Sequence, residues 1–133
     1  MLKKHQLPLT SGLISVNLVV IQHYRGIFMD VIERIKSQVG SSPVLLYMKG
    51  TPDFPQCGFS GRAIQILEQC GAEYAYVNIF EDPEIRENLK VFSNWPTFPQ
   101  LFVNGELVGG SDIMQEMFQK GELQNLLAEA GGK

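Results

Sequence analysis

The stretch that decides the fold is residues 44–60, which read VLLYMKGTPDFPQCGFS. The run from Val44 to Met48 is apolar almost throughout, which is typical of a strand buried on both faces of an α/β sheet. A loop with two prolines and one glycine follows this run. A helix is expected to begin at Gly58, so Cys57 lies immediately before the start of a helix.

The segment before this stretch predicts a short amphipathic helix. Apolar residues recur at helical spacing between residues 30 and 39. Asp30 is a candidate N-cap with Glu33 at capping-box spacing, and Gly40 is a candidate stop.

The segments after it alternate between strand and helix. A βαβ unit requires a parallel pair of strands with a right-handed crossover, and a hairpin around Asn104-Gly105 adds antiparallel strands. We therefore predict an α/β fold with a small mixed four-stranded sheet and helices on both faces. The helix expected to begin at Gly58 should stop near Gly71. The elements expected beyond it are a strand at 73–79, a helix at 82–92, hairpin strands at 100–103 and 106–108, and two helices around 113–118 and 123–127.

Composition and charge fit a single globular domain. The chain has 133 residues, of which 44% are hydrophobic and 19% charged, and its net charge is -3. A mildly acidic chain is a poor candidate for binding nucleic acid or an anionic membrane. We therefore predict neither of these as a partner.

The counts of reactive residues exclude several kinds of site. Both histidines, His5 and His23, lie in the first 28 residues, so a Ser-His or Cys-His nucleophilic site or a His-ligated zinc site is not expected in the body of the chain. Two cysteines, Cys57 and Cys70, cannot fill a four-cysteine metal site. Any iron-sulfur cluster would need thiolates from outside this chain. The lack of a disulfide framework favours a reducing compartment.

Charge also marks a boundary near Met29. Residues 1–28 hold three basic and no acidic residues, whereas residues 29–133 hold 8 basic and 14 acidic ones. The apolar stretch at 13–21 is too short to span a bilayer. Residues 1–28 resemble a weak signal peptide or a transit peptide, or Met29 is the true start, which is the interpretation we favour. We expect this leader to be poorly ordered or loosely docked, and residues 29–133 to form the domain.

Cys57 is the candidate reactive group. Free N–H groups and the dipole at a helix N-terminus stabilise a thiolate and lower its pKa, and Lys49 and Arg62 add positive potential. Such a thiolate is a nucleophile and a soft metal ligand. The alternative is a structural cysteine, because free cysteine is among the most buried residue types. Cys70 fits that alternative, with apolar neighbours and a position about 20 Å from Cys57 along the helix.

Three ordered motifs carry a resemblance to a known family. They are residues 48–60, with Met48-Lys49-Gly50-Thr51-Pro52 and Pro55-Gln56-Cys57-Gly58-Phe59-Ser60, then Trp95-Pro96-Thr97-Phe98-Pro99-Gln100, then residues 103–112, VNGELVGGSD. Together they resemble the CGFS class of monothiol glutaredoxins over about residues 30–130. The resemblance implies a thioredoxin-like fold.

The resemblance assigns roles around the cysteine. Cys57 would be the active cysteine, and Ser60 stands where dithiol members carry a second one. Lys49 and Arg86 would bind the glycine carboxylate of glutathione. Without the resemblance, Lys49 is better interpreted as a solvated lysine at a strand end, and Arg86 as the partner of Asp82 in a surface ion pair.

The two later motifs would supply the rest of the glutathione site. Pro99 would be a cis-proline, which presents the backbone of Phe98 to the cysteine part of glutathione, although a trans bond is favoured from the residues alone. Ser111 and Asp112 would bind the γ-glutamyl end, and they are also candidates for the N-cap of the next helix. Trp95 and Phe59 either face a partner or pack in part against the domain, and packing is favoured for Trp95.

Two functions of different classes follow from the resemblance. The first is an iron-sulfur carrier in the cytoplasm, or in an organelle if the leader is a transit peptide. In it, two Cys57 thiolates and two glutathiones hold a labile 2Fe-2S cluster across a homodimer, for delivery to apo iron-sulfur proteins or pairing with a BolA-type protein. The second is a glutathione-dependent thiol-disulfide oxidoreductase. CGFS relatives tend to be weak at this reaction, so the chain would be at most a weak enzyme. A binding module without chemistry is a third interpretation.

Overall fold

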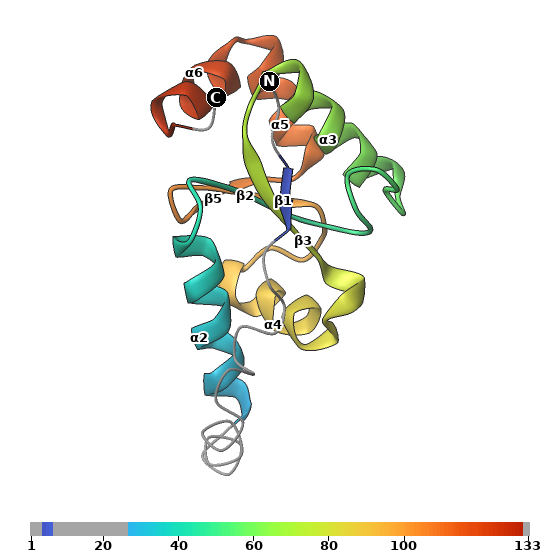
Figure 1. The fold of residues 1–133 in the computed structure, drawn as a ribbon, viewed down its shortest axis with the longest axis vertical. Helices are drawn as coiled ribbons and strands as arrows, with labels where there is room; N and C mark the ends of the chain where they lie inside the picture. Colours follow the sequence, from blue (N-terminus) through green and yellow to red (C-terminus); the bar gives the residue numbers. More distant parts are fainter. Residues whose placement is uncertain (1–3, 7–26, 132–133) are drawn as a thin grey trace.

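Five strands in the described part of the chain form one mixed sheet in the order β1-β3-β2-β4-β5. The computed structural model describes residues 4–6 and 27–131 (Figure 1). Central strand β2 runs parallel to β3 and antiparallel to β4, as the βαβ unit and the hairpin predict. The strands are β1 (Lys4–Gln6), β2 (Val44–Met48), β3 (Tyr74–Asn78), β4 (Gln100–Val103) and β5 (Glu106–Gly109).

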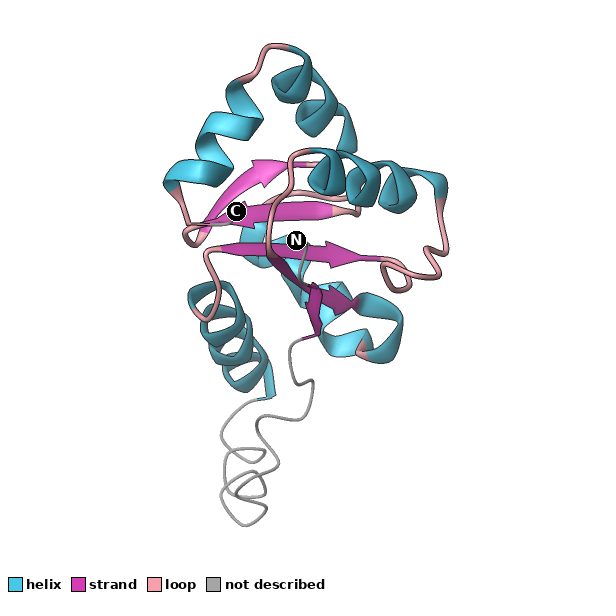
Figure 2. Ribbon diagram, turned by 45° about the horizontal axis from the view of Figure 1, so that its top comes forward, coloured by secondary structure: helices cyan, strands magenta, loops and turns pink. Residues whose placement is uncertain are grey.

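The helices cover both faces of this sheet (Figures 1 and 2). Alternate residues of β2 point to opposite faces: Val44, Leu46 and Met48 pack with α3, α5 and α6, whereas Leu45 and Tyr47 pack with α2 and α4. All five β2 side chains are buried, which confirms a strand covered on both faces. The helices are α2 (Ile27–Gly40), α3 (Gly58–Gln69), the 3-10 turn η2 (Ile79–Glu81), α4 (Pro83–Ser93), α5 (Ser111–Gln119) and α6 (Glu122–Glu129).

The first helix begins earlier than expected. α2 starts at Ile27, so the prediction of Asp30 as N-cap was wrong, and Asp30 lies in the first turn instead. An acidic side chain there still interacts favourably with the helix dipole. The predicted stop at Gly40 is confirmed.

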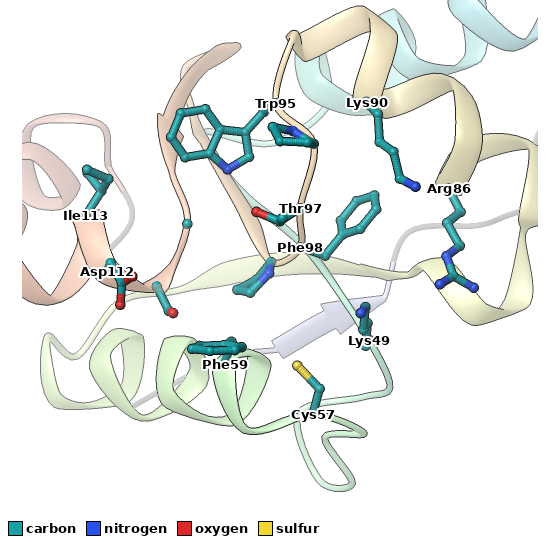
Figure 3. Close-up of a pocket in the computed structure, with 14 residues that line it drawn as sticks. Lys49, Cys57, Phe59, Arg86, Lys90, Trp95, Thr97, Phe98, Asp112 and Ile113 are labelled. Carbon is teal, nitrogen blue, oxygen red and sulfur yellow. The ribbon is translucent and has the colours of Figure 1, made fainter.

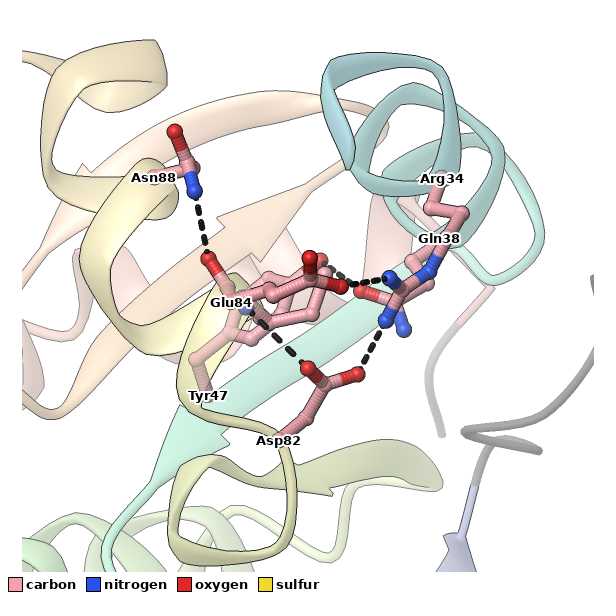
Figure 4. A network of polar contacts seen from close by, with 7 residues as sticks. Arg34, Gln38, Tyr47, Asp82, Glu84 and Asn88 are labelled. Carbon is pink, nitrogen blue, oxygen red and sulfur yellow. Dashed lines mark hydrogen bonds and ion pairs between the residues drawn. The ribbon is translucent and has the colours of Figure 1, made fainter. Parts of the chain in front are cut away.

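A polar network ties α2 to the start of α4 (Figure 4). Arg34 of α2 pairs with Asp82 and with Glu84, and Asp82 in turn accepts the Ile85 N–H as the N-cap of α4. The Tyr47 hydroxyl donates to Gln38 Oε1 at 2.8 Å. These contacts fix α4, which carries Arg86, against the rest of the domain.

The leader, residues 1–28, contributes strand β1 and the first two residues of α2. The four expected strands are confirmed, and β1 adds a fifth at the outer edge by pairing in parallel with β3. The rest of the leader, residues 1–3 and 7–26, lies outside the described residues, so the expectation that it is poorly ordered or loosely docked stays a prediction. Within residues 4–6 and 27–131, none of the helices has the length and apolar character needed to cross a membrane.

The predicted two-residue hairpin is confirmed. Asn104 and Gly105 have φ values of 52° and 82°, the left-handed pair that a type I′ turn requires. This turn returns the chain along β5 to Gly109. The N-terminus of α5 therefore lies at the end of the sheet where β2 leads into the loop before Cys57.

Candidate functional site

Cys57 lies at the N-cap of α3. Its backbone is extended (φ -156°, ψ 150°), and its Sγ accepts the Ser60 N–H at 3.5 Å. The Cys57 thiol also lies 3.8 Å from the Ser60 hydroxyl, which itself accepts the Lys49 N–H at 3.0 Å. The sequence placed Cys57 correctly before the helix, but it gave no sign that buried Ser60 would join Cys57 to the end of β2.

The surroundings of Cys57 favour its thiolate. Partial burial is the largest single influence and opposes ionisation. The hydrogen bonds from Ser60 and from the Phe59 N–H, together with the charge of Lys49, outweigh that burial and lower the pKa of Cys57 below its ordinary value. Cys57 is free and partly exposed, so the thiolate is accessible.

A tight loop between β2 and α3 holds Cys57 in place. Gly50 has φ +93°, and a Cβ there would lie 2.5 Å from the Phe54 carbonyl oxygen, so this position requires glycine. The Gly50 N–H donates to Asn78 Oδ1 at 3.0 Å, and the Gln56 N–H donates to the Lys49 carbonyl at 2.8 Å. The loop is thereby closed on itself and anchored to the end of β3.

A pocket of about 440 Å³ opens beside Cys57 (Figure 3). That volume suits a small-molecule ligand. All six residues predicted for the site line it, namely Lys49, Cys57, Arg86, Phe98, Ser111 and Asp112. They come from four separate parts of the chain, and the fold brings them together.

Charge is distributed unevenly around the pocket. Figure 3 shows Lys49, Arg86 and Lys90 on one side, and Asp112 on the other. Asp112 lies in the first turn of α5. The N-cap of this helix is Gly110, which has no side chain to accept a hydrogen bond. Among the described residues no side chain caps the first N–H groups of α5, so these groups can bind an anion. The pocket suits a ligand with an anionic group at each end and an amine near Asp112.

The wall opposite Cys57 is formed by the segment before β4. The Phe98–Pro99 bond is cis, as the family resemblance implies, so the trans bond favoured from the residues alone was wrong. Gln100, which is fully buried, donates through Nε2 to the carbonyls of Trp95 (2.9 Å) and Thr97 (3.1 Å). One buried amide thus holds the wall in shape.

Comparison with known proteins places this arrangement in a family. The glutaredoxin family model matches residues 44–108. The chain is 56% identical over 105 residues to glutaredoxin 4 of Haemophilus ducreyi, covering 79% of this chain and 98% of that protein. The chain belongs to the glutaredoxin family. It is also 56% identical over 102 residues to glutaredoxin 4 of Escherichia coli K12, covering 77% and 89% of the two chains.

A solved structure confirms the thioredoxin-like glutaredoxin fold. Reduced apo GrxS14 of poplar superposes with a TM-score of 0.66 at 47% identity, covering 74% of this chain and 91% of that one.

Several roles predicted from the residues alone, without the family resemblance, were wrong. Asp82 pairs with Arg34 and not with Arg86, because Asp82 faces α2. Ser111 and Asp112 do not cap α5, because the extended backbone at Gly110 places the helix start one residue earlier. Arg62, expected near the thiolate, pairs instead with Asp112 at 3.5 Å.

Of the other residues singled out from the sequence, Trp95 and Phe59 line the pocket and Cys70 packs against the core. Trp95 is partly buried, whereas Phe59 is 56% exposed. Cys70 is the C-cap of α3 and packs against the core, and burial raises the pKa of its thiol. A structural role for Cys70 fits this packing.

Sequence reasoning missed further pocket residues, notably Lys90 and Thr97. Lys90 follows Arg86 by four residues, so the two lie on one face of α4. That spacing was visible in the sequence and could have identified Lys90. Thr97 belongs to the wall segment, and its exposure to the pocket depends on the path of that wall, which no local pattern reveals.

Proposed function

We propose that this chain is a monothiol glutaredoxin that binds glutathione and, as a homodimer, carries a labile bridging 2Fe-2S cluster for iron-sulfur assembly and transfer. The observation that carries the proposal is a single partly exposed cysteine, with its pKa lowered, at the mouth of a pocket with cations on one side and a helix N-terminus on the other. The cations and the helix N-terminus match a ligand with two carboxylates, and the reactive cysteine matches a ligand with a thiol.

Glutathione fits the charge pattern of this pocket. Its glycine carboxylate would bind Lys49 and Arg86, and its γ-glutamyl end would bind the Ser111 N–H and the Asp112 carboxylate. The backbone of Phe98 would pair with the cysteine part of the ligand like an added strand. In this pose the thiol of glutathione lies beside Cys57.

The cluster is the cargo of the proposed carrier. A 2Fe-2S cluster needs four ligands, and in the described part of the chain no three His, Cys, Asp or Glu side chains come together as a metal site. One thiolate per chain is consistent with two Cys57 ligands and two glutathione ligands at a subunit junction. Exchangeable ligands make such a cluster labile, which suits delivery to apo iron-sulfur proteins or pairing with a BolA-type protein.

The lowered pKa of Cys57 also favours a second candidate function, glutathione-dependent thiol-disulfide exchange. The Cys57 thiolate would attack the glutathione sulfur of a protein mixed disulfide and release the protein thiolate, which takes up a proton. The thiolate of a second glutathione would then attack the Cys57-glutathione disulfide, giving oxidised glutathione and free Cys57. Ser60 prevents an intramolecular disulfide at that spacing. Either function needs a reduced Cys57, so we propose a cytoplasmic location.

Anaerobic reconstitution with iron and sulfide, with and without glutathione, separates these functions. The carrier predicts a visible cluster absorption on a dimer that forms when glutathione is present and fails to form when it is omitted. A colourless monomer that exchanges glutathione with a mixed disulfide would contradict the carrier and support the oxidoreductase.

A further inference from the structure

Arg86 is the cation of the pocket whose orientation needs an explanation. Its Nε is buried and has no hydrogen-bond partner among residues 4–6 and 27–131. A guanidinium on a long side chain has considerable rotamer freedom, and ordering it to meet a carboxylate costs free energy. Some other contact must therefore favour the conformation that reaches the pocket.

Phe80 provides that contact. The Cζ atom of Arg86 lies 5.4 Å from the centroid of the Phe80 ring, within the range of a cation–π interaction. Phe80 is 46% exposed, so its ring contributes little to the core and is available to the guanidinium. The face of an aromatic ring attracts a guanidinium without neutralising it, so the charge remains available to a ligand. Lys90, by contrast, lies 3.7 Å from the carboxylate of Glu87.

The backbone of Phe80 is itself fixed to the active-site loop. Its N–H donates to Asn78 Oδ1 at 3.0 Å, and the same oxygen accepts the Gly50 N–H at 3.0 Å. Asn78 is buried, so this junction is shielded from water. The ring is thus held at a defined place relative to the loop that carries Cys57.

We propose that Phe80 is a positioning residue that holds the Arg86 guanidinium toward the pocket, where it binds the glycine carboxylate of glutathione. This inference rests on the proposed binding of glutathione. Phe80 does not line the pocket, so it acts through Arg86 and not by touching the ligand.

The test compares three ring variants of the full chain by calorimetric titration with reduced glutathione. Phe80→Leu removes the ring face and is expected to weaken binding about two- to fivefold. Phe80→Tyr and Phe80→Trp keep a ring face and are expected to bind as the parent does. Because the side chain is exposed, all three should fold, and circular dichroism checks this.

Two controls show whether the effect passes through Arg86. In an Arg86→Met background, Phe80→Leu should cause no further loss of affinity. With glutathione amidated at its glycine carboxylate, Phe80→Leu and the parent should bind equally. Loss of affinity that persists in either control would overturn the inference, because the ring would then act by another route.

The remaining outcomes separate this inference from the proposed function. A parent chain that binds glutathione while Phe80→Leu binds it equally well overturns the role of Phe80 and leaves the proposed function standing. A parent chain that binds no glutathione overturns both.

Discussion

The two ends of α3 place the same residue type in opposite environments. Cys57 at the N-cap receives N–H groups and lies near Lys49, and its pKa is lowered despite partial burial. Cys70 at the C-cap packs against apolar side chains, and burial raises its pKa. The polarity of the helix and the packing around each end, and not the cysteine itself, therefore decide which thiol is reactive.

Replacement of Cys57, the reactive thiol, should have the largest effect on function. Cys57→Ser should abolish both cluster retention and thiol exchange, because the proposed nucleophile and ligand is gone. Cys70→Ser, at the other end, should change neither. Absorption spectra after reconstitution and assays of mixed-disulfide reduction check both variants, and loss of the cluster in Cys70→Ser would show that a ligand has been misplaced.

The rate of alkylation should differ between the two thiols. A lowered pKa means that Cys57 is still thiolate at a pH where an ordinary cysteine is protonated, so its reaction with iodoacetamide should persist to lower pH. Cys70, with its raised pKa, should react only as the pH rises above the ordinary range. Mass spectrometry of peptides labelled at a series of pH values measures both profiles, and coincident profiles would remove the contrast between the two ends.

Two glycines with positive φ, Gly50 in the loop before α3 and Gly71 just after α3, differ in the space around them. Gly50→Ala should destabilise the fold by about 2–5 kcal/mol, because it adds a clash with the Phe54 carbonyl to an unfavourable φ. Gly71→Ala also has positive φ but meets no atom within 4 Å, and should cost about 1–2 kcal/mol. Urea denaturation gives both values. Equal costs would mean that the loop at Gly50 yields to the added methyl group.

Replacing Gln100 or Gln124 by methionine should have smaller effects on stability than Gly50→Ala, and the two variants should differ in glutathione binding. Gln100→Met leaves two wall carbonyls without their donor and should lower stability by about 1–3 kcal/mol and weaken glutathione binding. Gln124 donates once, to the Phe118 carbonyl at 3.3 Å, on the side of the sheet where Cys70 packs. Gln124→Met should cost about 0.5–1.5 kcal/mol and leave binding unchanged. Thermal unfolding measures the stability and calorimetry the affinity for glutathione. Equally weakened binding in Gln124→Met would contradict the role of Gln100 in holding the pocket wall.

Much of the fold was predictable from local patterns. The buried run at β2, the Asn104-Gly105 turn and the helix expected at 82–92 each depend on residues close in sequence, and all three are confirmed. Strand β1 was not predictable, because three residues without apolar alternation give no strand signal. Its pairing with β3 becomes visible only in the folded sheet.

Part of the candidate site was likewise predictable from the sequence, and part was not. The position of Cys57 at a helix start follows from its neighbours, and the six predicted pocket residues follow from the family resemblance. The hydrogen bonds from Gln100 to Trp95 and Thr97, and the Phe80 ring beside Arg86, join residues that are close in the chain but follow no helix or strand spacing. These contacts depend on the path of irregular segments and leave no periodicity in the sequence, so only the structure reveals them.

In the proposed carrier, each chain supplies one thiolate and glutathione supplies the rest of the ligand set. Chemical analysis of the anaerobically reconstituted, purified protein for iron, sulfide and glutathione tests this ligand set. A 2Fe-2S cluster shared by two chains predicts one iron, one sulfide and one glutathione per chain. Iron and sulfide retained in that ratio without glutathione would contradict this ligand set.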